Sequence, residues 1–446
     1  MANGYLIQNA RLVNEGRITE GDLLIRDGRI ARLGGAIPAA AGDTVLDAAG
    51  RVLMPGMIDD QVHFREPGLT HKADIATESR AALAGGITSF MEMPNTKPQT
   101  ISLQALEDKF ALAAGRSFGN YAFYLGATND NLEELRVLEP GRTCGIKVFM
   151  GASTGNMLVN DEAVLERIFA EVRVPIAAHC EDTPTIERNE EAFRRKYGDN
   201  IPPRCHPEIR SAEACYLSSS LAVRLARRHG TRLHVLHLTS SRELALFDDA
   251  PLAQKRITAE VCVHHLYFSE QDYEEKGHLI KCNPAVKYPE DRRALQRALV
   301  SGRLDVVGTD HAPHTLEEKQ NPYFKAPAGL PLVQHAVPLL LELYHDQMAP
   351  LELLVEKACH APAQLFGVQE RGYLREGYWA DLVLLDLNKP QQVRREECLY
   401  KCGWSPLEGR TLRTRVAATF VNGHLAYDQG RLSDQPRGMR LGFAAG

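Results

Sequence analysis

Apolar residues alternate with polar and turn residues at both ends of the chain, in the pattern of short β-strands. Near the N-terminus, residues 22–34 carry Asp27-Gly28 between alternating apolar positions, and residues 416–432 carry Asn422-Gly423 in the same way. Both dipeptides tolerate the positive φ angles of a two-residue hairpin turn. We therefore expect both ends to contribute strands to one small β-sandwich.

The long middle of the chain follows a different pattern, in which short apolar runs are often followed by helical patterns. Apolar runs lie at 87–93, 121–128, 144–152, 174–180, 232–240, 257–268 and 304–314, and helical patterns lie at 103–115, 161–172 and 242–248. Strands that alternate with helices form parallel sheets with crossover connections. About eight such units fit the interval, so the predicted fold class is α/β, a (β/α)₈ TIM-like barrel with a small β-sandwich domain. The expected domains are 1–54 and 371–446 for the sandwich and tail, and 55–370 for the barrel.

Composition narrows the function by exclusion. The chain is 44% hydrophobic and 24% charged, with a formal net charge of −5, so neither nucleic acid nor an anionic membrane is an expected partner. No apolar run reaches the roughly 18 residues of a membrane span, and the N-terminus lacks the pattern of a secretory signal. The nine cysteines are scattered without a CxxC pair. We expect a reduced, cytoplasmic protein.

Polar side chains stand where several predicted strands end, and this end of a barrel carries the active site. They are Asp59, Gln61 and His63 at or just after an earlier apolar run at 51–59, Lys147 within 144–152, His179 in 174–180, His234 and His237 in 232–240, and Asp310, His311 and His314 in 304–314. Imidazole and carboxylate groups from separate strands bind a hydrolytic metal ion and leave one position open for water.

Each of these residues also has a simpler interpretation when taken alone. A histidine at a strand end is often a hydrogen-bonded structural residue, which is the interpretation we favour for His234. Lys147 alone would be a snorkelling or ion-paired side chain, and Asp310 alone a helix N-cap. Five buried polar side chains with no shared purpose would carry large desolvation costs, which favours a common site.

The motifs at these positions resemble those of the metal-dependent amidohydrolase superfamily and, within it, those of the dihydroorotases. The matching segments are PGMIDDQVHFREPGLTHK (55–72), GITSFMEMPNTKP (86–98), GIKVFMGASTGNML (145–158), AAHCED (177–182), HPEIRSAEA (206–214), LHVLHLTS (233–240), HHL (264–266), KCNPAVK (281–287), GTDHAPH (308–314) and GYWADLVLLDL (377–387). The resemblance implies the reversible cyclisation of N-carbamoyl-L-aspartate to L-dihydroorotate in pyrimidine biosynthesis. It also implies a small-molecule partner and a homo-oligomer.

The resemblance further implies roles for individual residues. His63, Lys147, His179, His237 and Asp310 match metal ligands, with Lys147 at the position of an N6-carboxylated lysine and Asp310 also carrying the proton. Residues that match substrate contacts are His63, Arg65, Asn95, Asn283, His314, Ala328 and Gly329. Arg65 follows His63 by two residues, so both are expected on one face of an extended segment, where the guanidinium can grip a carboxylate.

Gln61 departs from the family pattern Asp-x-His-x-His, because it replaces the first histidine. An amide oxygen is a weaker zinc ligand than imidazole. Three outcomes remain open: Gln61 coordinates weakly, the site takes a harder ion, or only the Lys147/His179/His237 position is firmly filled. We expect one firmly bound Zn²⁺ and a weaker or absent second ion.

Two other functions stay open at this point. A hydantoinase- or allantoinase-like enzyme would share the metal scaffold without binding a ring carboxylate. A non-catalytic scaffold would have lost metal ligands, and Gln61 is the feature that points to it. For Arg65 the structural alternative is an ion pair with Glu66, and for Asn95 it is a turn residue. The Gly-rich stretch 151–160 is expected to be a mobile loop or an ordered turn, and residues 401–409 have no assigned role.

Overall fold

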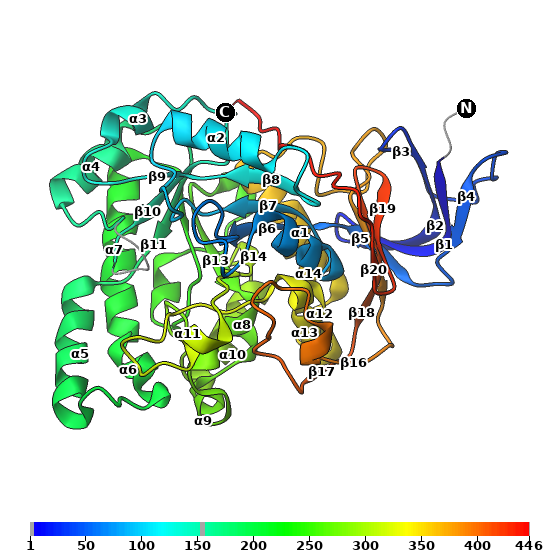
Figure 1. Cartoon of the computed structure of the whole chain (residues 1–446). Coiled ribbons are helices and arrows are strands. Elements are labelled where there is room, and N and C mark those ends of the chain that lie inside the picture. Colours follow the sequence, from blue (N-terminus) through cyan, green and yellow to red (C-terminus); the bar gives the residue numbers. More distant parts are fainter. Residues whose placement is uncertain (1–3, 152–156, 446) are drawn as a thin grey trace.

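The computed structural model describes residues 4–151 and 157–445, in which a barrel ringed by helices lies beside a smaller β-sheet structure (Figure 1). The barrel and the β-sandwich built from both termini confirm the predicted fold class. The loop predicted at 151–160 falls largely on residues outside this description. Within it, Val159 donates its backbone N–H to the Phe149 carbonyl at 2.9 Å.

Eight parallel strands form the barrel. They are β6 (Met57–Val62), β7 (Ile87–Glu92), β8 (Asn120–Phe123) continued by β9 (Leu125–Gly126), β10 (Ile146–Phe149), β11 (Ile176–His179), β12 (Leu233–Val235), β13 (Ile257–Cys262) and β14 (Val306–Gly308). A parallel bridge between Val62 and His311 joins the last strand region to the first. Nearly every strand residue is buried, as expected for strands that are covered by helices outside and by packed side chains inside.

Helices connect and cover these strands. They are α1 (Ile75–Ala84), α2 (Leu103–Ala113), α3 (Leu132–Arg136), α4 (Glu162–Glu171), α5 (Thr183–Tyr197), α6 (His206–Ile209), α7 (Ala212–His229), α8 (Val263–Tyr267), α9 (Tyr273–Lys276), α10 (Pro289–Val300), α11 (Leu316–Lys319), α12 (Ala336–Leu340), α13 (Glu342–His345), α14 (Leu351–Val355) and α15 (Ala361–Phe366). Their ends carry local signals: Asp74 caps α1, and Gly230 ends α7 in a left-handed conformation. The helix expected over 242–248 is only a 3₁₀ turn, Glu243–Leu246.

The sandwich is built on a nine-stranded sheet from both ends of the chain. Its strands are β1 (Tyr5–Asn14), β2 (Arg17–Arg26), β3 (Arg29–Leu33), β4 (Thr44–Asp47), β5 (Val52–Pro55), β15 (Leu382–Asp386), β18 (Arg415–Val421), β19 (His424–Asp428) and β20 (Arg431–Leu432). A separate short pair is formed by β16 (Gln391–Gln392) and β17 (Thr411–Leu412). Both predicted hairpins are present, with Asp27-Gly28 between β2 and β3 and Asn422-Gly423 between β18 and β19, and all four residues have positive φ.

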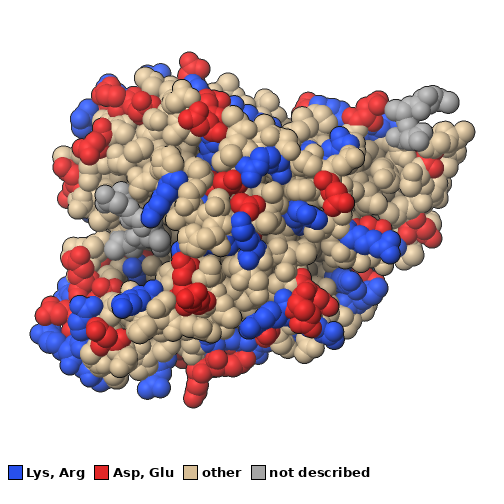
Figure 2. Space-filling model, in the orientation of Figure 1, with Lys and Arg blue, Asp and Glu red and all other residues tan. Residues whose placement is uncertain are grey.

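Charged side chains of both signs lie on the surface (Figure 2), and the cysteines are unpaired. On the face that Figure 2 shows, acidic and basic side chains are intermingled rather than gathered by sign. Within residues 4–151 and 157–445, no helix is both long and apolar enough to cross a membrane. All nine cysteines are free, and seven of them are buried.

Candidate metal centre and active site

The predicted site residues come from the carboxyl ends of separate barrel strands. Gln61 and His63 lie at the end of β6, Lys147 on β10 and His179 at the end of β11, while His237 and Asp310 follow β12 and β14. All six side chains are buried. Parallel pairing of β10 with β11 sets Lys147 and Phe149 opposite Ala177 and His179, so Lys147 lies on the strand next to His179.

Three site residues have left-handed backbone conformations. Arg65 has φ +69°, His237 φ +40° and Asp310 φ +47°. Such angles are uncommon for residues with a side chain, and they concentrate where the surrounding structure fixes a functional group. The prediction that His63 and Arg65 share an extended segment was wrong, because β6 ends at Val62 and the chain turns at Arg65.

His179 and His237 form one half of the site. Nδ1 of His179 lies 3.0 Å from Nε2 of His237, and Nε2 of His179 donates to Glu181 at 3.0 Å. Arg210 donates to the same Glu181 oxygen at 2.5 Å. The Glu181 contact places the His179 proton on Nε2, so Nδ1 turns a lone pair toward His237.

Charge and burial keep this pair neutral. Burial lowers the pKa of His179, and it lowers the pKa of His237 well below its usual range with help from His179 and Lys147. Burial alone would raise the pKa of Glu181, but Arg210 and His179 bring it down to about 2. Neutral imidazole is the form that binds a metal ion.

His63 and Asp310 form the other half. The His63 ring donates from Nδ1 to the Asn95 amide oxygen at 2.8 Å, so its Nε2 turns a lone pair toward an Asp310 oxygen at 3.2 Å. Gln61 Nε2 donates to that same Asp310 oxygen at 3.0 Å, and Gln61 Oε1 is buried without a partner in the described chain. The His63 lone pair and the Asp310 carboxylate repel each other unless a cation lies between them. Gln61 offers an N–H group, and not its amide oxygen, to the same carboxylate in this arrangement.

Lys147 is fully buried on β10, beside the strand of His179, without an acidic hydrogen-bond partner in the described chain. Burial lowers its pKa to about 8, while the charges of Asp310 and Glu260 favour the ammonium. Its charge in turn lowers the pKa of His63, His179 and His237, which locates it near both halves. The donor set of imidazoles, one carboxylate and one lysine therefore fits a metal ion, best at the Lys147/His179/His237 position.

Arg65, His314 and Lys72 form a basic wall beside Asp310. Arg65 Nε donates to the Pro313 carbonyl at 3.1 Å, and its NH2 lies 3.1 Å from His314 Nε2. Lys72 donates to His314 Nδ1 at 2.9 Å, so His314 Nε2 carries the proton that goes to the Ala328 carbonyl at 3.0 Å. Burial lowers the Arg65 pKa to about 10. The alternative role of Arg65, an ion pair with Glu66, is not seen, because Glu66 pairs with Arg116 at 3.0 Å.

The other predicted substrate contacts lie on segments that Lys319 holds together. Its ammonium donates to the carbonyls of Lys281, Pro327 and Gly329 at 2.9–3.0 Å. Gly329 donates its N–H to the Lys281 carbonyl at 2.9 Å, and Asn283 Oδ1 is buried without a partner in the described chain. Backbone groups of Ala328 and Gly329 are therefore largely engaged, whereas the Asn283 amide oxygen is available to a ligand.

Several supporting residues have no sequence signal of their own. Glu181 holds His179, while Asn95, which the sequence did predict as a substrate contact, also accepts from His63 through its amide oxygen. Trp404, within the unassigned 401–409 segment, donates from its buried indole to the His314 carbonyl at 2.8 Å. Glu78 accepts from His311 at 2.8 Å, which accounts for that histidine without a metal. The sequence points to these supporting residues only indirectly, through the motifs of the site residues that they contact.

Comparison with known proteins identifies the family of this chain. Residues 52–426 match the model of the family described as "Amidohydrolase family". A protein named dihydroorotase from Methanosarcina acetivorans is 33% identical over 416 residues, which cover 90% of this chain and 88% of that protein. The chain belongs to the amidohydrolase family.

Other relatives of this amidohydrolase carry related names. A dihydroorotase from Pyrococcus abyssi is 31% identical over 438 residues, covering 98% of both chains. Among solved structures, an L-hydantoinase (dihydropyrimidinase) from Arthrobacter aurescens has a TM-score of 0.92 and 27% identity, covering 99% of this chain and 100% of that one. A dihydropyrimidinase from Brevibacillus agri has a TM-score of 0.89 at 22% identity and supports the fold.

Proposed function

We propose that this amidohydrolase is a zinc-dependent dihydroorotase, which interconverts N-carbamoyl-L-aspartate and L-dihydroorotate. The observation that carries the proposal is Arg65, a buried guanidinium beside Asp310 that has no carboxylate partner in the described chain. A ring carboxylate supplies that partner through two parallel hydrogen bonds. Relatives named dihydroorotase at 31–33% identity support the same substrate.

We assign one firm Zn²⁺ to Lys147, His179 and His237, and a weaker second position to His63 and Asp310. When bound, zinc would lower the pKa of water toward about 7 and polarise the amide carbonyl. Gln61 weakens the second position because its amide N–H groups face Asp310. Lys147 is assigned as N6-carboxylated, since a pKa of about 8 leaves part of the amine neutral and able to react with CO₂.

In ring opening, Asp310 takes the proton of the attacking water and returns it to the leaving ring nitrogen. In ring closure, the same carboxylate takes the proton of the ureido nitrogen and gives it to the departing hydroxide, which leaves as water. Arg65 and Asn283 hold the substrate, and His314 beside Arg65 donates to the Ala328 carbonyl. The site lies among buried side chains, which strengthens each of these electrostatic contacts.

The L-hydantoinase neighbour favours a second candidate, opening of an uncharged cyclic imide. An uncharged ring leaves the Arg65 guanidinium without an anionic partner, so we rank this candidate below dihydroorotase. A non-catalytic scaffold ranks lower still, because Lys147, His179, His237, Asp310 and Arg65 are all present and buried.

Three measurements on the purified protein separate these functions: zinc content, turnover of L-dihydroorotate, and turnover of hydantoin. We expect bound zinc, turnover of dihydroorotate in both directions, and loss of that activity on chelation with recovery on adding Zn²⁺. Turnover of hydantoin alone would replace the proposal with the second candidate. A zinc-loaded protein inactive on both rings would leave only the scaffold.

A further inference from the structure

A second group of metal-ligand side chains lies inside the barrel, outside the proposed active site. Asp60 on β6, His234 on β12 and Glu260 on β13 are fully buried, and their ligand atoms all lie within 4.8 Å of one another. His234 pairs in register with Ala177 and Thr258, one layer below His179 and His237. We propose that these three residues bind a divalent transition-metal ion.

The hydrogen bonds of His234 direct a lone pair into this group. Thr258 donates its hydroxyl to the Leu233 carbonyl at 3.3 Å and lies 2.8 Å from Nδ1 of His234, so it accepts the Nδ1 proton. Nε2 then faces Asp60 Oδ2 at 3.1 Å and Glu260 Oε2 at 4.0 Å. Two ligands on one ion at about 2.1 Å lie roughly 3–4 Å apart, so these separations match a shared ion.

Two carboxylate oxygens in the group lack partners. Asp60 Oδ1 and Glu260 Oε2 are buried with no hydrogen bond in the described chain. Glu260 is held through its other oxygen, which accepts from Cys262 Sγ at 2.9 Å and from the His237 backbone N–H at 3.3 Å. Its free oxygen is thereby turned toward His234. Two buried carboxylates with unsatisfied oxygens are costly, and a divalent ion offsets both charges where one proton offsets a single charge.

Gly308 on β14 keeps space open beside the carboxylates. A Cβ at this position would lie 3.0 Å from Glu260 Cδ and 3.2 Å from Asp60 Oδ1. Both carboxylates therefore converge on the bare backbone of one glycine. The donor set of two carboxylates and one imidazole suits Mn²⁺, Fe²⁺ or Zn²⁺.

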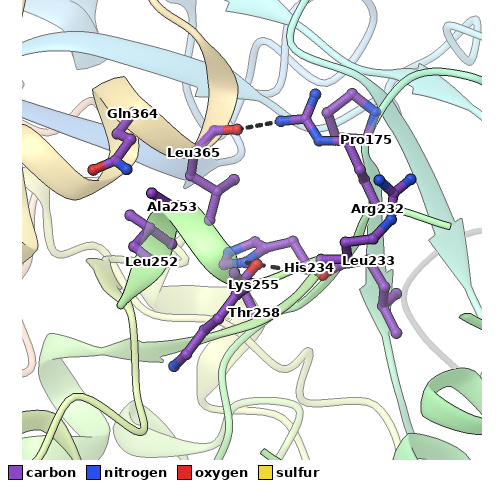
Figure 3. A pocket seen from close by; sticks show the side chains of 11 residues that line it. Pro175, Arg232, Leu233, His234, Leu252, Ala253, Lys255, Thr258, Gln364 and Leu365 are labelled. Carbon is purple, nitrogen blue, oxygen red and sulfur yellow. Dashed lines mark hydrogen bonds between the residues drawn. The ribbon is translucent and has the colours of Figure 1, made fainter. Parts of the chain in front are cut away.

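A pocket of about 340 Å³ reaches His234 from the amino-terminal ends of the strands (Figure 3). Its wall includes His234, Thr258 and the apolar side chains of Leu252 and Leu365, and Arg232 donates to the Leu365 carbonyl at 2.6 Å. Arg232, Lys255 and Arg256 also line it, and their positive charge opposes entry of a cation. We therefore expect the ion to be taken up as the chain folds. For this reason, the experiment supplies Mn²⁺ in the growth medium during expression.

The first test counts metal in protein expressed with Mn²⁺. A His179→Ala/His237→Ala variant removes the proposed zinc ligands and is expected to keep about one ion per chain, visible by elemental analysis and by Mn²⁺ electron paramagnetic resonance. Adding Asp60→Asn or Glu260→Gln should remove that ion. Adding Glu243→Gln, which alters a buried carboxylate bonded to Ser219 and Ser240, should not. A metal-free double variant, or an ion that survives both Asp60→Asn and Glu260→Gln, would overturn the proposal.

The second test needs no variant. Crystals of the wild-type protein grown with Mn²⁺ and measured at the manganese absorption edge should show an anomalous peak between Asp60, His234 and Glu260. Refined density without a peak there would equally overturn the site. Both tests measure the position and content of metal, so their outcome does not depend on whether the protein turns over dihydroorotate.

Discussion

At the scale of the residue, neighbours decide which nitrogen of each site histidine carries a proton. Asn95 takes the Nδ1 proton of His63, Glu181 takes the Nε2 proton of His179, and Lys72 directs the His314 proton to Nε2. The lone pairs of His63 and His179 therefore point into the site. Such partners fix ligand orientation and metal affinity as much as the ligands themselves do.

Asp310→Asn should abolish turnover while the fold is kept. The amide has the size of the carboxylate but cannot accept and return a proton, so we expect kcat to fall by about 10²- to 10⁴-fold. Steady-state kinetics measure the loss, and an unchanged thermal transition serves as the control for folding. Wild-type-like turnover in this variant would remove Asp310 from the chemistry.

Arg65→Ala should discriminate between substrates. Loss of a charge-assisted pair costs about 1.5–3 kcal/mol, so kcat/KM for dihydroorotate should fall by roughly 10- to 150-fold, with a much smaller effect on an uncharged cyclic imide. Arg116→Ala is the matched control, because Arg116 pairs with Glu66 outside the basic wall. Equal losses on the two substrates would refute the carboxylate-binding role.

The positions of the site residues could be predicted from the sequence, but their contacts could not. Each metal-ligand candidate stands within an apolar run or just after one, which is a local pattern. The bonds between Gln61 and Asp310 and between His63 and Asn95 join residues 249 and 32 positions apart. They depend on closure of the barrel and on rotamers that no local pattern fixes.

At the scale of the element, one buried ion pair joins the sandwich to the barrel. Asp381, just before β15, pairs with Arg371 and also accepts from Asn120 of β8 at 3.0 Å and from the Asn422 backbone at 2.8 Å. The Asn422 side chain donates to Asn120 Oδ1 at 2.8 Å. The hairpin turn of the sandwich is thus tied to the first residue of a barrel strand.

Asp381→Ala should destabilise the protein strongly, because it leaves the buried Arg371 guanidinium uncompensated. We expect a loss of about 3–5 kcal/mol in the free energy of unfolding, measured by urea denaturation. Glu370→Ala removes an exposed ion pair with Arg29 and should cost at most about 1 kcal/mol. Similar losses in both variants would argue against the joining role of Asp381.

Elements with strong local signals were the ones that the sequence could predict. The two hairpins depend on dipeptides that tolerate positive φ, and both were confirmed. The helix expected over 242–248 was wrong, because Asp248, Asp249 and Pro251 stop the apolar pattern after one turn. The long helices α5 and α7 fill the crossover between β11 and β12, and their partly polar sequences gave no clear helical pattern.

At the scale of the whole molecule, many histidines are buried in neutral form. Burial lowers the pKa of His264 and of His335 to about 4, and it lowers the pKa of His206, His265 and His311 as well. Above about pH 6.5 these groups are neutral in both folded and unfolded chains. As the pH falls from 6.5 toward 4, the unfolded chain binds more protons, so stability decreases.

His335→Gln should flatten this acid dependence. His335 lies outside the site, next to the Tyr400 hydroxyl at 3.2 Å, and its pKa shift from 6.5 to about 4 corresponds to about 3 kcal/mol. We expect the free energy of unfolding to vary less between pH 6.5 and 4 in the variant, as measured by urea denaturation at several pH values. An unchanged slope would mean that His335 is protonated in the folded chain.

The overall architecture followed from periodicity, whereas the path of the tail did not. Strand-then-helix alternation predicted the barrel, and turn-rich ends predicted the sandwich. After β20 the chain leaves the sandwich and runs back along the barrel, where Arg440 bridges to Tyr121 and Phe443 to Val368. This return depends on burial of Leu441 and Phe443 against the barrel. The short, irregular tail has no periodic pattern from which that burial could be predicted.

Diffraction data collected at the zinc absorption edge from wild-type crystals test the central claim most directly. The account predicts one strong anomalous peak bounded by Lys147, His179 Nδ1 and His237 Nε2, with extra density on the Lys147 amine and a weaker peak or none at His63 and Asp310. An empty Lys147/His179/His237 position in zinc-loaded crystals would contradict it.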